Sequence, residues 1–226
     1  MPRRHTAPVN ILVTAGPTRE PLDPVRFISN RSSGKMGYEM AAAFAHAGHT
    51  VLLVSGPTAL DVPDHVDFLP VETAAEMYEA VAYHLGRMEV AVFAAAVADY
   101  TTAAAPQKIK KSTDTFTLEL VKTRDILGSA RTTLGFAGTL IGFAAETENL
   151  EANAREKLTR KGCNLIIAND VSKPGIGFDS DQNEVIMVHP DHTEALPLAS
   201  KHDLAHQLVQ AILEIHFSAS FLKTSN

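Results

Sequence analysis

The sequence predicts an α/β fold in which helices cover both faces of a mainly parallel sheet. Three short segments, residues 89–97, 140–145 and 164–168, are continuously rather than alternately apolar after a polar first residue in two of them. Continuous apolar strands are typical of sheets that are buried on both faces. Segments with the periodicity of a helix separate these strands, as crossover connections in a parallel sheet require.

Two strands and one helix are predicted near the beginning of the chain. Residues 10–15 are apolar and partly β-branched, and like residues 50–54 they end at a Gly-Pro turn signal. After a polar, Pro-rich stretch, a helix is expected to begin after Gly34 and to end at Gly48. Its apolar residues recur at helical spacing: Met36, Met40, Phe44 and Ala47.

Three further helices follow from capping and periodicity. Thr73 and Glu76 have the spacing of a capping box, which predicts a helix that begins after Thr73. Residues 148–161 form a second helical pattern that ends at Gly162. A last helix is expected after Ser200, where apolar residues again recur at helical spacing.

Residues 101–120 predict a mobile basic loop that leads into an exposed strand. The segment is rich in Thr and Ala, then carries Lys108, Lys110 and Lys111, and then alternates apolar and polar residues over 116–120. Lysines in a loop that closes over substrate suit the neutralisation of a polyphosphate. A solvated charge run is the alternative.

Length and charge limit the possible classes of protein. The 226 residues carry a net charge of -6, and 45% of them are apolar, which favours a soluble globular domain over a general nucleic-acid binder. One cysteine, no secretory signal and no membrane span favour the cytoplasm. We expect a single domain over residues 1–226, with flexible tails at 1–9 and 217–226.

A Gly/Ser-rich loop that opens into a helix is the main candidate for anion binding. Residues 29–37 match neither G-x-G-x-x-G nor a Walker loop. The N–H groups of Ser32, Ser33 and Gly34 at a helix N-terminus would nevertheless suit a substrate phosphate. The preceding Asn30 offers an amide donor for an oxyanion. An ordinary loop with serine caps and a turn asparagine is the alternative.

Other polar and small residues allow two interpretations each. Lys157 and Lys161 share one helix face, which either binds an anion or complements the helix dipole. Residues 94–99 end a strand with small side chains and Asp99, which suits a flat ligand or tight packing. Cys163 is expected in the core. Three histidine pairs have metal-like spacing but are expected on the surface: His46 and His49, His189 and His192, and His202 and His206.

Five segments together resemble the bacterial phosphopantothenoylcysteine synthetases. They are TAGPTREPLDPVRFISNRSSGKMG (14–37), AAVADY (95–100), KIKK (108–111), GFAAET (142–147) and ANDV (168–171). The resemblance extends from about residue 10 to residue 213, and its first segment is long and specific. In many bacteria this unit is the C-terminal half of a protein whose N-terminal half is a flavin-dependent decarboxylase. The resemblance therefore implies no flavin in this chain.

The resemblance implies a Rossmann-like three-layer fold with a smaller dimerisation subregion. Asn30 matches the asparagine that handles the activated intermediate, and Lys108 matches the lysine needed to form it. Arg124 lies where a relative carries proline, so contacts of that segment are less secure. The positions that match nucleotide-binding residues are Phe93, Ala94, Ala95, Asp99, Lys108, Arg124, Asp125, Ile126, Leu127, Phe143, Lys157 and Lys161.

The reaction implied by the resemblance joins 4'-phosphopantothenate to L-cysteine at the expense of CTP. The carboxylate first attacks the α-phosphate, with Mg²⁺ and a lysine offsetting the charge, and the amine of cysteine then attacks the acyl-cytidylate. The bacterial character of the motifs favours CTP over ATP. The resemblance also implies a homodimer and an association with a phosphopantothenoylcysteine decarboxylase, and it points to no metal ligands.

The sequence also allows two other functions. A nicotinamide-dependent oxidoreductase of Rossmann type would have a similar sheet, but the missing G-x-G-x-x-G argues against it. A non-catalytic nucleotide-binding module is the other alternative, and the presence of Asn30 and Lys108 argues against that reading.

Overall fold

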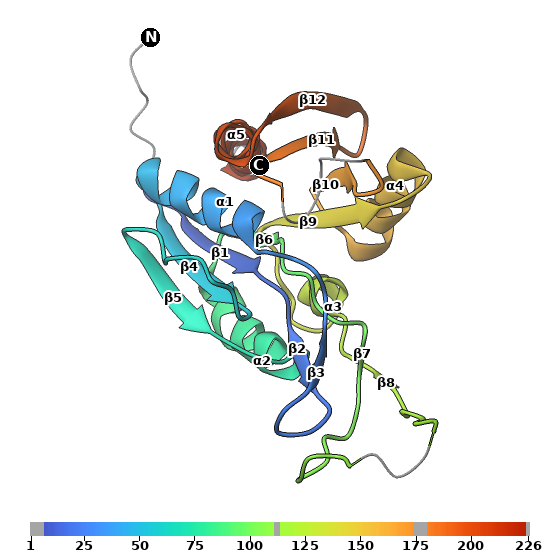
Figure 1. Ribbon diagram of the computed structural model, residues 1–226. Coiled ribbons are helices and arrows are strands. Elements are labelled where there is room, and N and C mark those ends of the chain that lie inside the picture. Colours follow the sequence, from blue (N-terminus) through green and yellow to red (C-terminus); the bar gives the residue numbers. More distant parts are fainter. Residues whose placement is uncertain (1–6, 111–113, 174–179, 225–226) are drawn as a thin grey trace.

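A computed structural model describes residues 7–110, 114–173 and 180–224, with side chains up to residue 218. Figure 1 shows one body of helices packed on a twisted sheet, with an arm that projects from it. The strands are β1 (Asn10–Ala15), β2 (Arg19–Pro21), β3 (Phe27–Ser29), β4 (Thr50–Ser55), β5 (Val66–Pro70), β6 (Val90–Phe93), β7 (Tyr100–Thr101), β8 (Val121–Lys122), β9 (Thr139–Glu146), β10 (Leu165–Asp170), β11 (Gln182–Val188) and β12 (Thr193–Ser200). The helices are α1 (Lys35–His46), α2 (Ala74–His84), α3 (Ile126–Thr132), α4 (Leu150–Lys161) and α5 (Lys201–Thr224), with a 3₁₀ turn at Leu85–Arg87.

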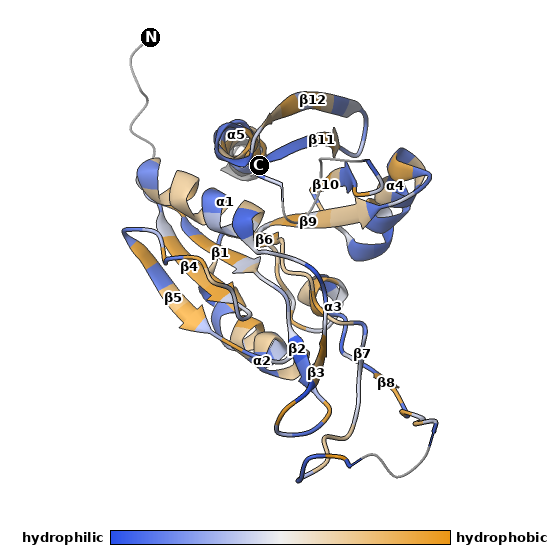
Figure 2. Cartoon of the chain, in the orientation of Figure 1, coloured by the Kyte–Doolittle hydropathy of each residue, from blue (hydrophilic) through white to orange (hydrophobic). Residues whose placement is uncertain are grey.

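The main sheet confirms the predicted fold class. Its strand order among the described residues is β12-β11-β10-β9-β6-β1-β4-β5, and the six strands from β10 to β5 are parallel. One apolar core lies between the sheet and helices α1 and α5, and a second lies between the opposite face and helices α2, α3 and α4. Figure 2 shows the corresponding apolar sheet between helices of mixed polarity. The result is a three-layer α/β fold.

Local signals located several elements correctly. The strand β1 has the predicted bounds, and α1 follows Gly34 as expected. Thr73 and Glu76 form both hydrogen bonds of the predicted capping box at the start of α2. Helix α4 ends at Gly162. Cys163 is buried as expected, and burial raises the pKa of its thiol to about 11.

Two predicted strands differ from the structure. The strand predicted over residues 89–97 ends at Phe93, because the following small residues turn toward β1, where the N–H of Ala95 donates to Oγ1 of Thr14 at 3.3 Å. The strand predicted over 116–120 is wrong: these residues form no strand, and β8 begins only at Val121. The alternating apolar and polar residues at 116–120 belong instead to an exposed, irregular segment of the arm.

The hairpin formed by β2 and β3 was not predicted from its Pro-rich sequence. The Asp23 carboxylate accepts from the N–H groups of Val25 and Arg26 at 2.9 and 3.0 Å, which closes the turn. Hydrogen bonds from the Arg26 side chain, and then from backbone N–H groups, hold the pKa of Asp23 well below its usual range. The Asp23 carboxylate therefore stays ionised and can accept further hydrogen bonds from the segment between β7 and β8.

The arm, which comprises β7, β8 and the segment between them, lies beside the turn of this hairpin (Figure 1) and is hydrogen-bonded to it. The N–H of Ile109 donates to Oδ2 of Asp23 at 3.0 Å, and the Arg26 guanidinium donates to the carbonyl of Ile109 at 2.9 Å. Lys108 and Lys110 are exposed on this arm, and Lys111 lies outside the described residues. The predicted mobility of the loop stays a prediction.

The ends of the chain differ from the predicted tails where the structure describes them. Val9, inside the N-terminal tail predicted at 1–9, is buried, while residues 1–6 lie outside the described part. Helix α5 continues through the predicted tail to Thr224. No helix in the described ranges has the length and apolar character needed to cross a membrane. The surface expectation is wrong for His49, which is buried and accepts the N–H of Val9 at 3.1 Å.

Candidate functional site

Two adjoining cavities lie at the carboxyl ends of the parallel strands β1, β6 and β9. Their volumes are about 330 and 290 Å³. Both are lined by Ala95, Val97, Asp99, Phe143 and Lys157, so they meet there and form one cleft. The carboxyl ends of strands are where open parallel sheets bind ligands. The fold thus places a bipartite site where the small residues after β6 leave room.

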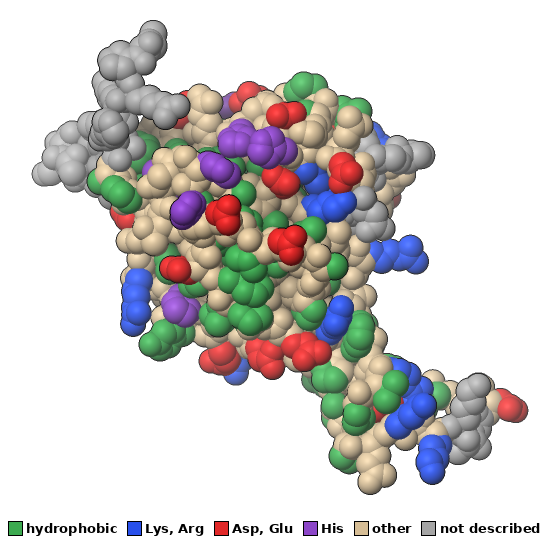
Figure 3. Space-filling view, turned by 60° about the vertical axis from the view of Figure 1, so that its left-hand side comes forward, with side chains coloured by type: hydrophobic (Ala, Val, Ile, Leu, Met, Phe, Trp, Pro, Cys, Tyr) green, Lys and Arg blue, Asp and Glu red, His purple; other side chains and the backbone are tan. Residues whose placement is uncertain are grey.

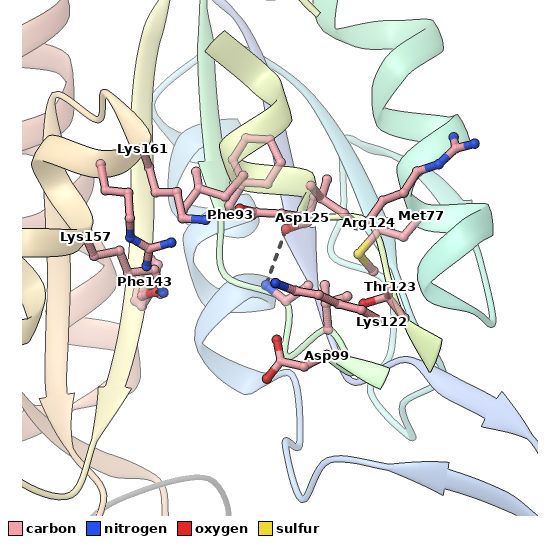
Figure 4. A pocket seen from close by; sticks show the side chains of 16 residues that line it. Met77, Phe93, Asp99, Lys122, Thr123, Arg124, Asp125, Phe143, Lys157 and Lys161 are labelled. Carbon is pink, nitrogen blue, oxygen red and sulfur yellow. Dashed lines mark hydrogen bonds and ion pairs between the residues drawn. The ribbon is translucent and has the colours of Figure 1, made fainter. Parts of the chain in front are cut away.

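The first cavity combines an apolar wall with a cationic one (Figure 4). Met77 of α2, Phe93 of β6 and Leu127 of α3 supply apolar surface. Helix α4 supplies the cations Lys157, Arg160 and Lys161. The structure brings together most of the predicted nucleotide-binding residues in this cavity: Phe93, Ala95, Asp99, Arg124, Asp125, Ile126, Leu127, Phe143, Lys157 and Lys161.

Lys161 and Asp125 form an ion pair on one side of the first cavity. Asp125 also caps α3, accepting from the N–H of Gly128 at 2.9 Å. Burial alone would raise the pKa of Asp125, but the bonds from Lys161 and the Gly128 N–H together hold it below its ordinary value. Lys161 is only 9% exposed, so the pair fixes its ammonium group at the cavity wall.

Lys157 lies where the two cavities meet. Its ammonium donates to the carbonyl of Phe143 at 2.7 Å. Burial lowers the pKa of this lysine, because a desolvated ammonium favours its neutral form. An anion bound at the junction would offset that penalty. A polyphosphate would therefore be a suitable partner for Lys157.

The side chain of Arg124 is turned toward α2 and away from the cavity (Figure 4). Its guanidinium stacks over the Tyr78 ring at 4.6 Å from the centroid and pairs with Glu79 at 2.8 Å. These contacts hold the segment against α2 from outside. Any contribution of residue 124 to the cavity therefore comes from its backbone and not from its charge.

The second cavity lies at the N-terminus of α1. It is lined by Ser32, Ser33 and Gly34 of the Gly/Ser-rich loop. Gly34 adopts φ +80°, and a Cβ there would come within 2.8 Å of Thr58 Cγ2. The first turn of α1 contains no acidic residue. The N–H groups and dipole at the start of a helix favour an anion, so this end of the cavity suits one.

Two lysines that the sequence analysis did not assign also line the second cavity. Lys35 follows Gly34 and pairs with Asp181 at 2.6 Å. Lys201 begins α5 and is only 6% exposed. Its position could not be inferred, because only the folded hairpin of β11 and β12 brings α5 to this cavity. Asn169 and Asn183 are further lining residues without a sequence signal.

Asn30 lies beside the second cavity, and Lys108 lies away from both. The Asn30 amide donates to the carbonyl of Ala96, a lining residue, at 2.9 Å. Lys108 is exposed on the arm and lines neither cavity. Ala94 lines only the second cavity. Within one chain, Asn30 therefore lies next to the cleft, whereas Lys108 does not.

Comparisons with known proteins agree with this architecture. Residues 7–215 match the family described as DNA/pantothenate metabolism flavoprotein C-terminal domain. The chain is 46% identical to the coenzyme A biosynthesis bifunctional protein CoaBC of Escherichia coli K12, over 92% of this chain and 54% of that protein. The CoaBC of Bacillus subtilis is 44% identical, over 90% of this chain and 50% of that protein. The chain thus spans about half the length of the curated relatives that it matches.

Solved structures confirm the fold. The crystal structure of the C-terminal domain of a CoaBC protein superposes with a TM-score of 0.77 at 42% identity, covering 90% of this chain and 93% of that one. The Streptococcus pneumoniae DNA/pantothenate metabolism flavoprotein gives 0.79 at 24% identity and covers 92% of this chain and all of that one, which supports the fold alone. The family resemblance drawn from the five sequence segments is therefore confirmed, and the chain belongs to the family of the DNA/pantothenate metabolism flavoprotein C-terminal domain.

Proposed function

We propose that this chain is a phosphopantothenate–cysteine ligase that uses CTP in coenzyme A synthesis. The observation that carries the proposal is the bipartite cleft, because two adjoining sites can hold a nucleotide and an acid end to end. Membership of a family whose relatives are named coenzyme A biosynthesis proteins supports this choice. Release of pyrophosphate that requires both phosphopantothenate and a nucleotide would test it, and release without the acid would contradict it.

The nucleotide is assigned to the first cavity. A base fits against the apolar wall of Met77, Phe93 and Leu127, while the phosphates extend toward Lys157 and the junction. Lys161 is held by Asp125 and so contributes a fixed charge at the wall. Because the reacting α-phosphate must face the acid, we place it where the cavities meet, beside Phe143 and Lys157.

Phosphopantothenate is assigned to the second cavity. Its carboxylate must reach the α-phosphate at the junction, so its own phosphate lies at the distant end. There the N–H groups at the start of α1 and the ammonium groups of Lys35 and Lys201 offset its charge. Ser32, Ser33 and Gly34 keep their predicted role as the loop that holds this phosphate.

The chemistry proceeds in two balanced steps. The carboxylate oxygen attacks the α-phosphorus, and the bond to pyrophosphate breaks. The cysteine amine then attacks the acyl carbon, and CMP leaves as the amine loses a proton. We assign Asn30 to the carbonyl oxygen during this attack, and Lys108 to the phosphate charge of the first step.

We propose that Mg²⁺ accompanies the nucleotide in the first step. Mg²⁺ is usually held by one or two carboxylates together with substrate phosphates. Asp99 fits that role, because it is exposed and lines both cavities, whereas Asp125 already pairs with Lys161. When bound, the ion would neutralise charge on the phosphates, and Asp99 would orient it toward the junction.

CTP should support turnover at least about a hundredfold better than ATP in kcat/KM, because a base pocket discriminates strongly when a wrong base leaves buried polar groups unpaired. Pyrophosphate release should be measured with each of the four ribonucleotides, with and without cysteine. Release without cysteine would report the first step alone. Equal kcat/KM for CTP and ATP would refute the nucleotide assignment while leaving the ligase reaction intact.

We further propose that the chain forms a homodimer through its arm. Figure 3 shows hydrophobic and basic side chains together on the projecting arm. Phe116 and Val121 of the arm are 61% and 58% exposed, and Val25 of the neighbouring hairpin is 60% exposed. Exposed apolar side chains of this density mark an interaction surface. A dimer would also allow the arm of one subunit to bring Lys108 toward the other.

Light scattering should give a mass of about twice 24.3 kDa for the native chain. The double substitution Phe116→Ser and Val121→Ser should yield a monomer with reduced ligase activity. Tyr83→Ser is the matched control, because Tyr83 is 69% exposed on α2, outside the arm. A fully active native monomer would contradict the dimer.

An association with a phosphopantothenoylcysteine decarboxylase and a cytoplasmic location remain part of the same proposal.

A further inference from the structure

A histidine pair at the tip of the C-terminal hairpin has no part in the proposed reaction. His189 and His192 flank the turn between β11 and β12, where the N–H of His189 donates to the carbonyl of His192 at 2.9 Å. Residues paired across antiparallel strands project to the same face. The two imidazole rings accordingly stack, with centroids 4.2 Å apart and planes 7° from parallel.

Glu194 lies on the same face as the two histidines. His192 immediately precedes β12, and Glu194 is the second residue of that strand. Side chains two residues apart in extended backbone point the same way. One potential ligand atom from each of the three residues lies within 4.8 Å of the others. Hairpin geometry therefore gathers two imidazoles and one carboxylate at one point.

The hydrogen bonds of these two histidines leave one ring nitrogen of each available as a metal ligand. Nε2 of His189 is buried and has no hydrogen-bond partner, which is a costly state for a polar atom. Nδ1 of His192 bonds the Asp191 carboxylate at 2.8 Å. A carboxylate on one ring nitrogen orients the other toward a metal, as in zinc sites of known proteins.

Arg155 of α4 also contacts this hairpin, and it does so away from the face that carries the two histidines. Its guanidinium donates to the carbonyl of His189 at 3.3 Å and to Oγ1 of Thr193 at 2.8 Å. Thr193 lies between His192 and Glu194 in the strand and so projects to the opposite face. Arg155 thus stabilises the turn from the face opposite to the two histidines.

We propose that His189, His192 and Glu194 form a binding site for a divalent transition metal, with Zn²⁺ as the best match. Imidazole and carboxylate together suit zinc better than the harder Mg²⁺. Zinc held about 2.0–2.2 Å from each donor requires the donors to approach one another. His192 and Glu194 are exposed and can make this movement by side-chain rotation, which also ends the parallel stacking of the rings.

The hairpin and the cleft are connected through strand β12. Strand β12 leads from the hairpin directly into Lys201, whose side chain lines the second cavity. The binding of zinc is nevertheless independent of the ligase reaction and can be measured without any substrate.

The test is calorimetric titration of the metal-free full chain with ZnCl₂. We expect one ion per chain, with affinity weakened about tenfold or more in His192→Ala and in Glu194→Gln, each of which loses a ligand. Both residues are exposed, so the variants should fold, and circular dichroism without metal verifies that they do. Zinc should raise the Tm of the native chain, and at the same zinc concentration it should raise that of His192→Ala by less.

The pair His202 and His206 provides the matched control. These residues also lie close together, with ring centroids 4.7 Å apart, and Nδ1 of His202 contacts Glu39 at 3.1 Å. They belong to no three-ligand cluster among the described residues. The variant His202→Ala with His206→Ala should bind zinc normally. The absence of zinc binding by the native chain, or equal affinity in His192→Ala, would overturn the proposal.

Discussion

Lys108→Gln should lower the rate of acyl-cytidylate formation by roughly 10²–10³-fold, the usual cost of one lost charge-assisted contact to a transition state. Negative charge develops on the α-phosphate and on the departing pyrophosphate, and glutamine cannot offset it. The lysine is exposed on the arm and lines neither cavity, so the effect also requires the arm to move or a second subunit to supply it.

The measurement is a single-turnover quench with labelled CTP in the absence of cysteine. Lys110→Gln is the matched control, because Lys110 is exposed on the same arm two positions away. Loss of the intermediate in Lys108→Gln alone would support the assigned role. Equal losses in both variants would show that the arm contributes only general positive charge.

Asn30→Asp should have the opposite signature: the acyl-cytidylate forms but converts to product roughly 10²-fold more slowly. The Asn30 amide donates to the carbonyl of Ala96 at 2.9 Å, so a carboxylate at this place would face a carbonyl oxygen without a donor between them. The new negative charge also repels the oxyanion that forms when the amine attacks.

The same quench, now with cysteine added, detects the accumulated intermediate. Asn30→Ala separates the two causes, because it removes the donor without adding charge. It should slow the second step less than Asn30→Asp does. If Asn30→Asp fails to form the intermediate while Lys108→Gln accumulates it, the two roles have been assigned in reverse.

The sequence predicted those parts of the fold that depend on local signals. Strand β1, the capping box of Thr73 and the stop of α4 at Gly162 follow from composition and spacing within a few residues. The hairpin of β2 and β3 was missed, because it depends on Asp23 and Arg26 bonding each other rather than on β-branched residues. The antiparallel pair β11 and β12 likewise has no local signature of its direction.

The site residues likewise divide into those that the motifs located and those that only the folded chain brings to the cleft. Motif resemblance located Phe93, Asp125 and the lysines of α4, which the structure gathers around one cavity. Lys201 was missed, because its place depends on the path of the chain through β11 and β12. The expectation that all histidine pairs lie on the surface failed at His49, whose ring accepts a backbone N–H from Val9, a partner that no spacing rule indicates.

The neighbourhood of β1 and β6 in the sheet also has a consequence for folding. The bond between Thr14 and Ala95 joins residues 81 positions apart, and contacts of such separation form late because a long loop must close before they stabilise anything. The β1–α1–β4 unit and helix α2 can form earlier from nearby residues. Because the cleft exists only after the two halves of the sheet have joined, a partly folded chain cannot hold either of the proposed substrates. Substrate binding then stabilises only the completed fold.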